Sequence, residues 1–112
     1  MSASASRHAF IVGVRPEKRE EYLQLHSAVW PGVEAKLSEC NIGNYSIFIT
    51  ENTLFAYYEY RGEDHAGDLA RIAQDPVTQE WWTHTDPCQV RIANEIEPGA
   101  AWQPIQEVWH LV

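Results

Sequence analysis

The pattern of apolar and polar positions changes from strand-like to helix-like near the start of the chain. Residues 8–14 (HAFIVGV) are apolar on both faces, which is typical of a strand covered on two sides. Over residues 16–37 the apolar side chains recur at helical spacing, and acidic residues near the start suit a helix N-terminus. Pro31 has no N–H to donate, so we expect a kink or two abutting helices beside His26 and Trp30.

The middle of the chain predicts a hairpin. Residues 44–50 (NYSIFIT) and 53–60 (TLFAYYEY) are rich in aromatic and β-branched side chains, and only two residues separate them. Asn52 in the turn tolerates a positive φ. The two-residue period of a strand places Tyr45, with the isoleucines at 47 and 49, on one face of this sheet.

The remaining pattern completes an α+β fold. Residues 64–73 predict a short helix, residues 77–83 another, residues 86–104 an irregular arm and residues 105–111 (IQEVWHL) a last strand. The order β-α-β-β-α-β is typical of the ferredoxin-like split βαβ fold, in which helices cover one face of an antiparallel sheet.

Apolar residues on both faces of most strands require a cover for the second face of the sheet. A second copy of the same sheet is the simplest cover, so we expect a two-fold homodimer. We expect residues 7–112 to form a single domain and residues 1–6, which have no apolar core, to be a disordered tail.

Composition narrows the range of partners. The 112 residues are 45% hydrophobic, and 16 acidic against 8 basic side chains give a formal charge of −8 without a basic patch. This charge disfavours nucleic acid and anionic membranes and permits a small neutral ligand. With no export signal, no apolar run of about 18 residues and two cysteines outside any metal-binding spacing, we expect a cytoplasmic protein with reduced thiols.

The familiar motifs of cofactor and metal enzymes do not occur. The sequence has no GxGxxG, GxxxxGK, GxSxG or HExxH pattern, so we expect no metal and no cofactor. Proton transfer needs little equipment, because one well-placed acid or base contributes about 10²- to 10⁴-fold in rate.

One helical face carries the leading candidates for such chemistry. Tyr22, His26 and Trp30 are four residues apart, so a helix projects them from one side. An imidazole exchanges protons near neutral pH, although a helical histidine is more often a partly buried packing residue. Tyr22 is expected to orient that ring, to contact the same ligand, or to serve in packing.

Further candidates lie on the second helix pair and the sheet. Trp81 and Trp82 are adjacent and cannot both point into one core, so at least one should face a pocket or a partner, unless both fill core and interface. Tyr45 reaches a pocket on the sheet or packs in the core. The other aromatic and imidazole side chains are expected to have packing, structural or solvated roles: Trp30, Trp102, Trp109, His8, His65, His84 and His110.

Six motifs are spread from His8 to Leu111: HAF, EEYLQLHSAVWPGVEAKL, GNYSIFI, LFAYYE, QEWWTHTDP and EVWHL. In these motifs the chain resembles the L-rhamnose mutarotase family. The resemblance implies a dimeric α/β barrel and a cytosolic isomerase that interconverts the anomers of a 6-deoxy sugar. It also implies that His26 is the proton donor and acceptor and that four residues contact the sugar: Tyr22, Tyr45, Trp81 and Trp82.

The arm after Pro87 leaves the substrate open. It contains CQVRIANEIEPGAAWQPIQ where better-known rhamnose enzymes have an Asn-Pro-Asp-Asn-Ser-like turn. A related branch, which resembles L-fucose mutarotases, has a Pro-Gly and a Trp in this arm. Pro98-Gly99 and Trp102 are similar to that pattern, so L-fucose is an alternative to L-rhamnose. Two alternatives from other classes are a cofactor-free monooxygenase, which often uses the same fold, and a sugar-binding module without catalysis.

Overall fold

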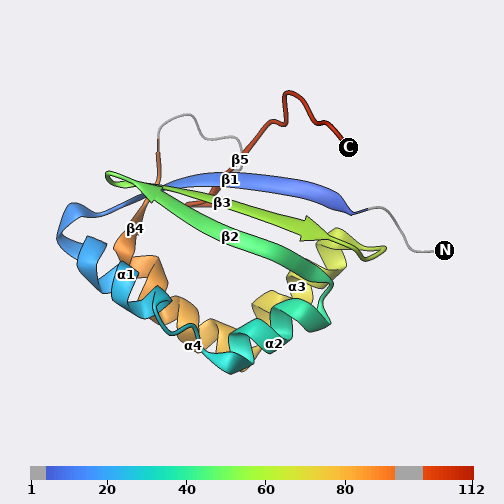
Figure 1. Cartoon of the computed structure of the whole chain (residues 1–112). Coiled ribbons are helices and arrows are strands. Elements are labelled where there is room, and N and C mark those ends of the chain that lie inside the picture. Colours follow the sequence, from blue (N-terminus) through green and yellow to red (C-terminus); the bar gives the residue numbers. More distant parts are fainter. Residues whose placement is uncertain (1–4, 93–99) are drawn as a thin grey trace.

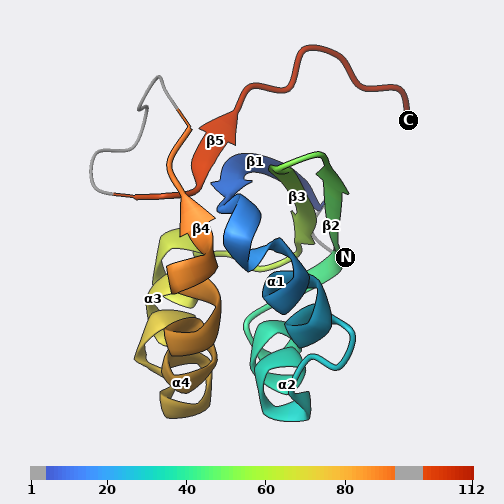
Figure 2. The same cartoon turned by 90° about the vertical axis from the view of Figure 1, so that its left-hand side faces the viewer.

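The computed structural model describes residues 5–92 and 100–112. An antiparallel sheet has the strand order β2-β3-β1, and β4 and β5 both pair with the outer edge of β1. Four helices cover one face of this curled sheet (Figure 1), and α3 and α4 lie beside each other with α2 against α4 (Figure 2). The elements are β1 (Ser6–Val14), η1 (Pro16–Lys18), α1 (Arg19–His26), α2 (Pro31–Glu39), β2 (Ile42–Thr50), β3 (Thr53–Tyr60), α3 (His65–Gln74), α4 (Pro76–Thr85), η2 (Asp86–Cys88), β4 (Gln89–Val90) and β5 (Gln103–Ile105).

The α+β, ferredoxin-like prediction is confirmed by this arrangement. The expected hairpin is β2–β3, paired from Ile42 with Tyr60 to Thr50 with Thr53. Its turn differs in one detail, because Glu51 takes the positive φ of 51° that we expected of Asn52. The chain thus has the protomer fold of the dimeric α/β barrel class.

The helix break expected near Pro31 is present as two separate helices. A 3-10 turn at Pro16 leads into α1, which ends at His26, and α2 begins at Pro31. Trp30 is extended (φ −63°, ψ 132°), which is the conformation that a following proline favours. The break therefore leaves His26 at the end of a helix rather than in its middle.

The prediction of a last strand over residues 105–111 is wrong. β5 is only Gln103–Ile105, and residues 106–112 have no regular structure and run away from the sheet on the side opposite the helices (Figure 1). The alternating pattern of this segment is typical of a strand with a paired neighbour, but β5 pairs with β1 only at Ala9–Ile11. Trp109, which we assigned to packing, is therefore 76% exposed.

The two segments that were expected to be irregular, residues 1–6 and residues 86–104, also differ from the prediction. The arm over residues 86–104 contains η2, the short β4 and the first two residues of β5, while its Pro98-Gly99 pair lies outside the described residues. Of the expected N-terminal tail, residues 1–4 lie outside the description, and Ser6 is already the first residue of β1.

The core lies between the sheet and the helices in two clusters. A first cluster joins the end of the sheet near the β2–β3 turn to α1 and η2, and a second joins the other end of the sheet to the α2–β2 junction and α3. The first contains Val12, Val14, Tyr22, Leu54 and Cys88, and the second Cys40, Ile42, Tyr58, Tyr60 and Ile72.

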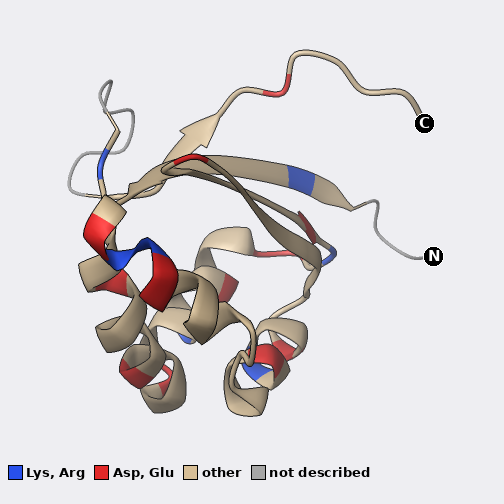
Figure 3. Cartoon of the chain, turned by 60° about the vertical axis from the view of Figure 1, so that its left-hand side comes forward, with Lys and Arg blue, Asp and Glu red and all other residues tan. Residues whose placement is uncertain are grey.

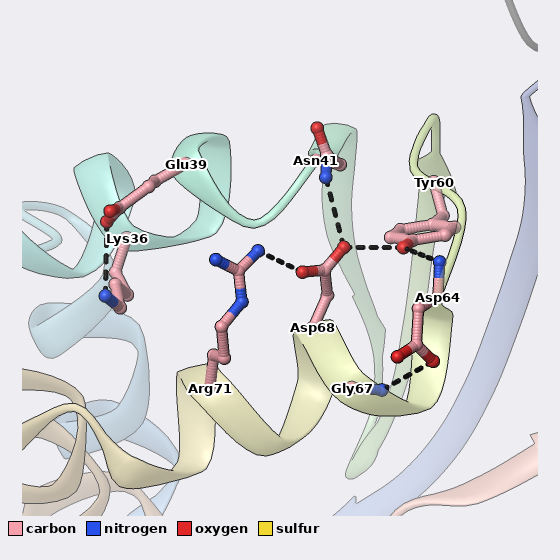
Figure 4. A network of polar contacts seen from close by, with 8 residues as sticks. All are labelled: Lys36, Glu39, Asn41, Tyr60, Asp64, Gly67, Asp68 and Arg71. Carbon is pink, nitrogen blue, oxygen red and sulfur yellow. Dashed lines mark hydrogen bonds and ion pairs between the residues drawn. The ribbon is translucent and has the colours of Figure 1, made fainter.

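A polar network fixes α3 against the sheet at the second cluster (Figure 4). The Asp68 carboxylate accepts hydrogen bonds from Tyr60 Oη at 2.5 Å and Asn41 Nδ2 at 3.0 Å, and it pairs with the Arg71 guanidinium. These donors lower the pKa of Asp68 to about 2. Asn41 has a φ of 68°, so the carboxylate also holds the left-handed turn between α2 and β2.

Candidate active site

A cavity of about 580 Å³ lies between the helical layer and the sheet. This volume falls within the range of about 300–1,000 Å³ typical of small-molecule sites. His26, Tyr45, Trp81 and Trp82 all line the cavity, so the structure brings together four of the five residues singled out in the sequence. Tyr22 is not among the lining residues; it is 2% exposed and lies behind His26.

His26 has a defined orientation at the end of α1. Its Nδ1 lies 3.0 Å from the backbone carbonyl oxygen of Tyr22, where a hydrogen on Nδ1 is donated to that oxygen. The ring stacks on Tyr22 at a centroid distance of 4.2 Å and meets the edge of Trp81 at 5.3 Å. With Nδ1 occupied, Nε2 is the unprotonated nitrogen that is available to a ligand.

Burial sets the protonation state of this imidazole. Desolvation lowers the pKa of His26 below its ordinary value of 6.5, and the hydrogen bond to the Tyr22 carbonyl offsets part of this shift. The ring is therefore neutral at neutral pH. A neutral imidazole can accept a proton at Nε2, and the carbonyl then stabilises the cation that forms.

Trp81 and Trp82 point in different directions, as the helical geometry of α4 requires. Trp81 is 5% exposed and packs edge-on against both His26 and Trp30, each at 5.3 Å. Trp82 lies about 100° further round the helix and is 37% exposed. Trp81 thus supports the imidazole, whereas Trp82 keeps ring surface that a ligand can cover. Trp30 has the packing role we expected.

Tyrosine hydroxyls provide further polar groups near the cavity. Tyr45 is half-exposed, and its ring lies 5.5 Å from that of Tyr58, a cavity residue that the sequence analysis missed. Burial raises the pKa of Tyr22, Tyr45 and Tyr58, so each phenol keeps its proton at neutral pH. Gln89, which partly offsets the raised pKa of Tyr22, is not among the residues that line the cavity.

The charge around the cavity suits an uncharged ligand. Among the described residues that line it, Glu34 alone carries a formal charge once His26 is neutral. Lysine and arginine residues are dispersed over the helices and strands (Figure 3). Within residues 5–92 and 100–112, no group of three or more His, Cys, Asp or Glu side chains could hold a metal ion.

The apolar part of the lining could not be recognised from the sequence. Val33, Leu37, Ile42, Leu69 and Ile72 complete the wall, yet their spacing is the same as that of core residues. Only the packing of three elements around one space distinguishes these residues from the rest of the core.

The fold and this site together define a small α+β protein with a neutral histidine in an aromatic cavity. Comparison with known proteins gives the family: the profile described as L-rhamnose mutarotase matches residues 7–111. The chain therefore belongs to the L-rhamnose mutarotase family, which is a family of isomerases.

Individual relatives agree with this assignment. The chain is 36% identical over 108 residues to the L-rhamnose mutarotase of Sinorhizobium fredii, covering 94% of this chain and 97% of that protein. The crystal structure of an L-rhamnose mutarotase from Formosa agariphila matches with a TM-score of 0.73 at 23% identity, covering 96% and 99% of the two chains.

A second solved structure shows that the fold is shared more widely. Tetracenomycin F2 cyclase from Streptomyces glaucescens, a type-II polyketide cyclase, matches with a TM-score of 0.64 at 13% identity, over 96% of this chain and 99% of that one. The fold alone therefore does not specify the chemistry, and the residues of the cavity must do so.

Among the described helices, none is long and apolar enough to cross a membrane.

Proposed function

We propose that the chain is a mutarotase that interconverts the α and β anomers of a 6-deoxy hexose, with L-rhamnose as the first choice of substrate. The observation that carries this proposal is the state of His26: a neutral ring whose Nδ1 is committed to the Tyr22 carbonyl and whose other nitrogen remains available at an aromatic cavity. The family of the chain and the names of its relatives support the same reaction.

The reaction needs one proton to move between two oxygens of the sugar. His26 Nε2 takes the proton of the anomeric hydroxyl as the bond from C1 to the ring oxygen breaks, which leaves an aldehyde and an alkoxide at that oxygen. The imidazolium returns the proton to the alkoxide. The aldehyde group then turns about the C1–C2 bond, and the reverse steps close the ring on either face of the carbonyl. No proton or electron is gained or lost, so in this proposal neither a metal nor a cofactor takes part.

The other site residues have binding and positioning roles in this proposal. Trp82 packs on the apolar C–H face of the sugar, Trp81 closes the wall behind His26, and Tyr45 holds a sugar hydroxyl. Tyr22 positions the imidazole by stacking and through its carbonyl. A direct sugar contact by its hydroxyl, which the family resemblance implies, is less compatible with its burial behind the ring.

We also propose that the working enzyme is a cytoplasmic homodimer of one domain, residues 7–112, in each chain. The outer face of the sheet carries Phe48 and Phe55, and the C-terminal segment carries Val108 and Trp109, all exposed in the single chain. A second copy can bury both sets of apolar side chains. Two buried free cysteines, Cys40 and Cys88, suit a reducing compartment.

Saturation transfer between the anomeric proton signals tests the proposed reaction. One anomeric proton of L-rhamnose, L-fucose or D-glucose is irradiated, and the loss of the other anomer's signal is followed with and without the protein. We expect enzyme-dependent transfer for a 6-deoxy sugar, and faster transfer with L-fucose would make that sugar the substrate. Folded protein that binds a sugar without accelerating exchange would instead be a binding module. Oxygen uptake with a quinol-like substrate would support a monooxygenase.

A further inference from the structure

We infer that Tyr58 is a sugar-binding residue of the cavity, fixed in place by His65 and His8, and that it helps the enzyme to choose between hexoses. This inference rests on the proposed mutarotase function. In it, Tyr58 binds a hydroxyl of the sugar that is distant from the anomeric carbon.

The contacts of Tyr58 hold its hydroxyl in one place. It is a β3 residue, 6% exposed, and it lines the cavity. Its Oη lies 2.7 Å from Nε2 of His65, the first residue of α3. The ring of His8, from β1, stacks on His65 at 4.1 Å and on Tyr58 at 5.2 Å. Two strands and a helix therefore fix one phenol.

The protonation states of these groups leave hydrogen-bonding capacity for a ligand. Burial lowers the pKa of both His8 and His65 and raises the pKa of Tyr58 to about 12, so all three are neutral at neutral pH. A phenol oxygen has one hydrogen to donate and lone pairs to accept, and the bond to His65 uses one of these functions. The remaining capacity matches a sugar hydroxyl.

The wall around this phenol is largely aliphatic. Ile42 and Ile72 pack with Tyr58 in the second core cluster, and both line the cavity. The bond to His65 offsets the cost of burying the hydroxyl, whereas a phenylalanine would fill the same space with no polar group to satisfy. A sugar hydroxyl bonded to this phenol would use the hydrogen-bonding function that His65 leaves open.

The position of Tyr58 separates it from the proton-transfer group. Tyr58 belongs to the second core cluster, whereas His26 stacks on Tyr22 of the first. The cavity is lined by His26 and Tyr58 alike, and Tyr45 lies against Tyr58. A sugar with its anomeric carbon at His26 would direct hydroxyls of the ring's other side toward Tyr58. L-Rhamnose and L-fucose differ in the configuration of such hydroxyls, so a fixed phenol favours one of them.

The test compares two tyrosines that are adjacent on β3. Tyr58→Phe removes the hydroxyl of a residue that lines the cavity, and Tyr57→Phe removes one from the other face of the sheet, where it donates to Glu59. Exchange rates over a range of sugar concentrations give kcat and KM for L-rhamnose and L-fucose. Loss of one net hydrogen bond should raise the KM of the better sugar about threefold to tenfold in Tyr58→Phe, with little change in kcat. The ratio of kcat/KM between the sugars should narrow, while Tyr57→Phe changes nothing.

His65 is a positioning residue in this inference, and its variants separate positioning from stability. His65→Ala should reproduce the change in sugar preference of Tyr58→Phe, and His65→Gln, which keeps a polar group near the Nε2 position, should restore part of it. An unchanged KM in Tyr58→Phe, or an equal loss for both sugars, would overturn the inference. Wild-type protein that accelerates neither sugar would overturn the proposed function itself, so the two failures are distinguishable.

Discussion

Trp81→Ala should destabilise the fold far more than Trp82→Ala, although the two residues are neighbours on α4. Trp81 is 5% exposed, and its edge contacts with His26 and Trp30 are lost together with its burial. Truncation of a buried tryptophan costs about 3–5 kcal/mol. Trp82 is 37% exposed, so the partial burial that it loses is worth roughly 1–2 kcal/mol.

Urea unfolding followed by far-ultraviolet circular dichroism measures both effects without relying on tryptophan fluorescence. Protein concentration is held constant, because association would contribute to the apparent stability, and the slopes of the transitions are compared before the midpoints are used. The folded Trp82→Ala protein should show a raised KM for the sugar. Equal losses of unfolding free energy in the two variants would refute the distinction between a supporting and a ligand-facing indole.

Three further predictions concern pH, the polar network and association. Because burial lowers the pKa of His26 below 6.5, enzyme-dependent exchange should fall in acid with a midpoint below pH 6.5; a midpoint above 6.5 would contradict this. Asp68→Asn should lower Tm more than Glu39→Gln, which removes an exposed ion pair and serves as the control. Folding lowers the pKa of Asp68 from 3.8 to about 2, so the difference in Tm between wild type and Asp68→Asn should decrease as the pH falls from 3.8 toward 2. Removal of residues 107–112 should convert a dimer to monomer in sedimentation equilibrium; an unchanged mass would exclude that segment from the interface.

The histidines also predict how stability depends on pH. The folded protein holds His8, His26 and His65 with lowered pKa values, whereas the unfolded chain protonates them near 6.5. Over the interval between these values the unfolded state binds more protons, so stability falls as the pH falls. Denaturant midpoints at about pH 7.5 and 5.5 should show this loss, and a smaller loss in the His26→Gln variant.

Most of the fold could be predicted because its elements have local sequence patterns. The hairpin has a two-residue period and a short turn, and the break between α1 and α2 follows from Pro31. The last strand could not be placed, because alternation in residues 105–111 indicates a surface to be covered and not which chain covers it. β4 was missed because two residues are too short to show any period.

The Tyr22–His26 part of the candidate site was visible in the sequence, and the wall that contains Tyr58 was not. Tyr22 and His26 are one helical turn apart, so their stacking follows from local geometry. Tyr58, His65 and His8 come from three elements, and only the pairing of β1 with β3 and the packing of α3 bring them together. A strand tyrosine and two isolated histidines carry no local pattern of such a contact.

The most direct test of the central claim is the exchange rate of L-rhamnose anomers with His26→Gln, measured beside wild type by saturation transfer. His84→Gln is the matched control, since that imidazole also packs on an aromatic ring, Trp30, but does not line the cavity. With both variants folded, we expect the His26 variant to lose about 10²- to 10⁴-fold in enzyme-dependent rate and the His84 variant to match wild type. Exchange at the wild-type rate in His26→Gln would contradict the account.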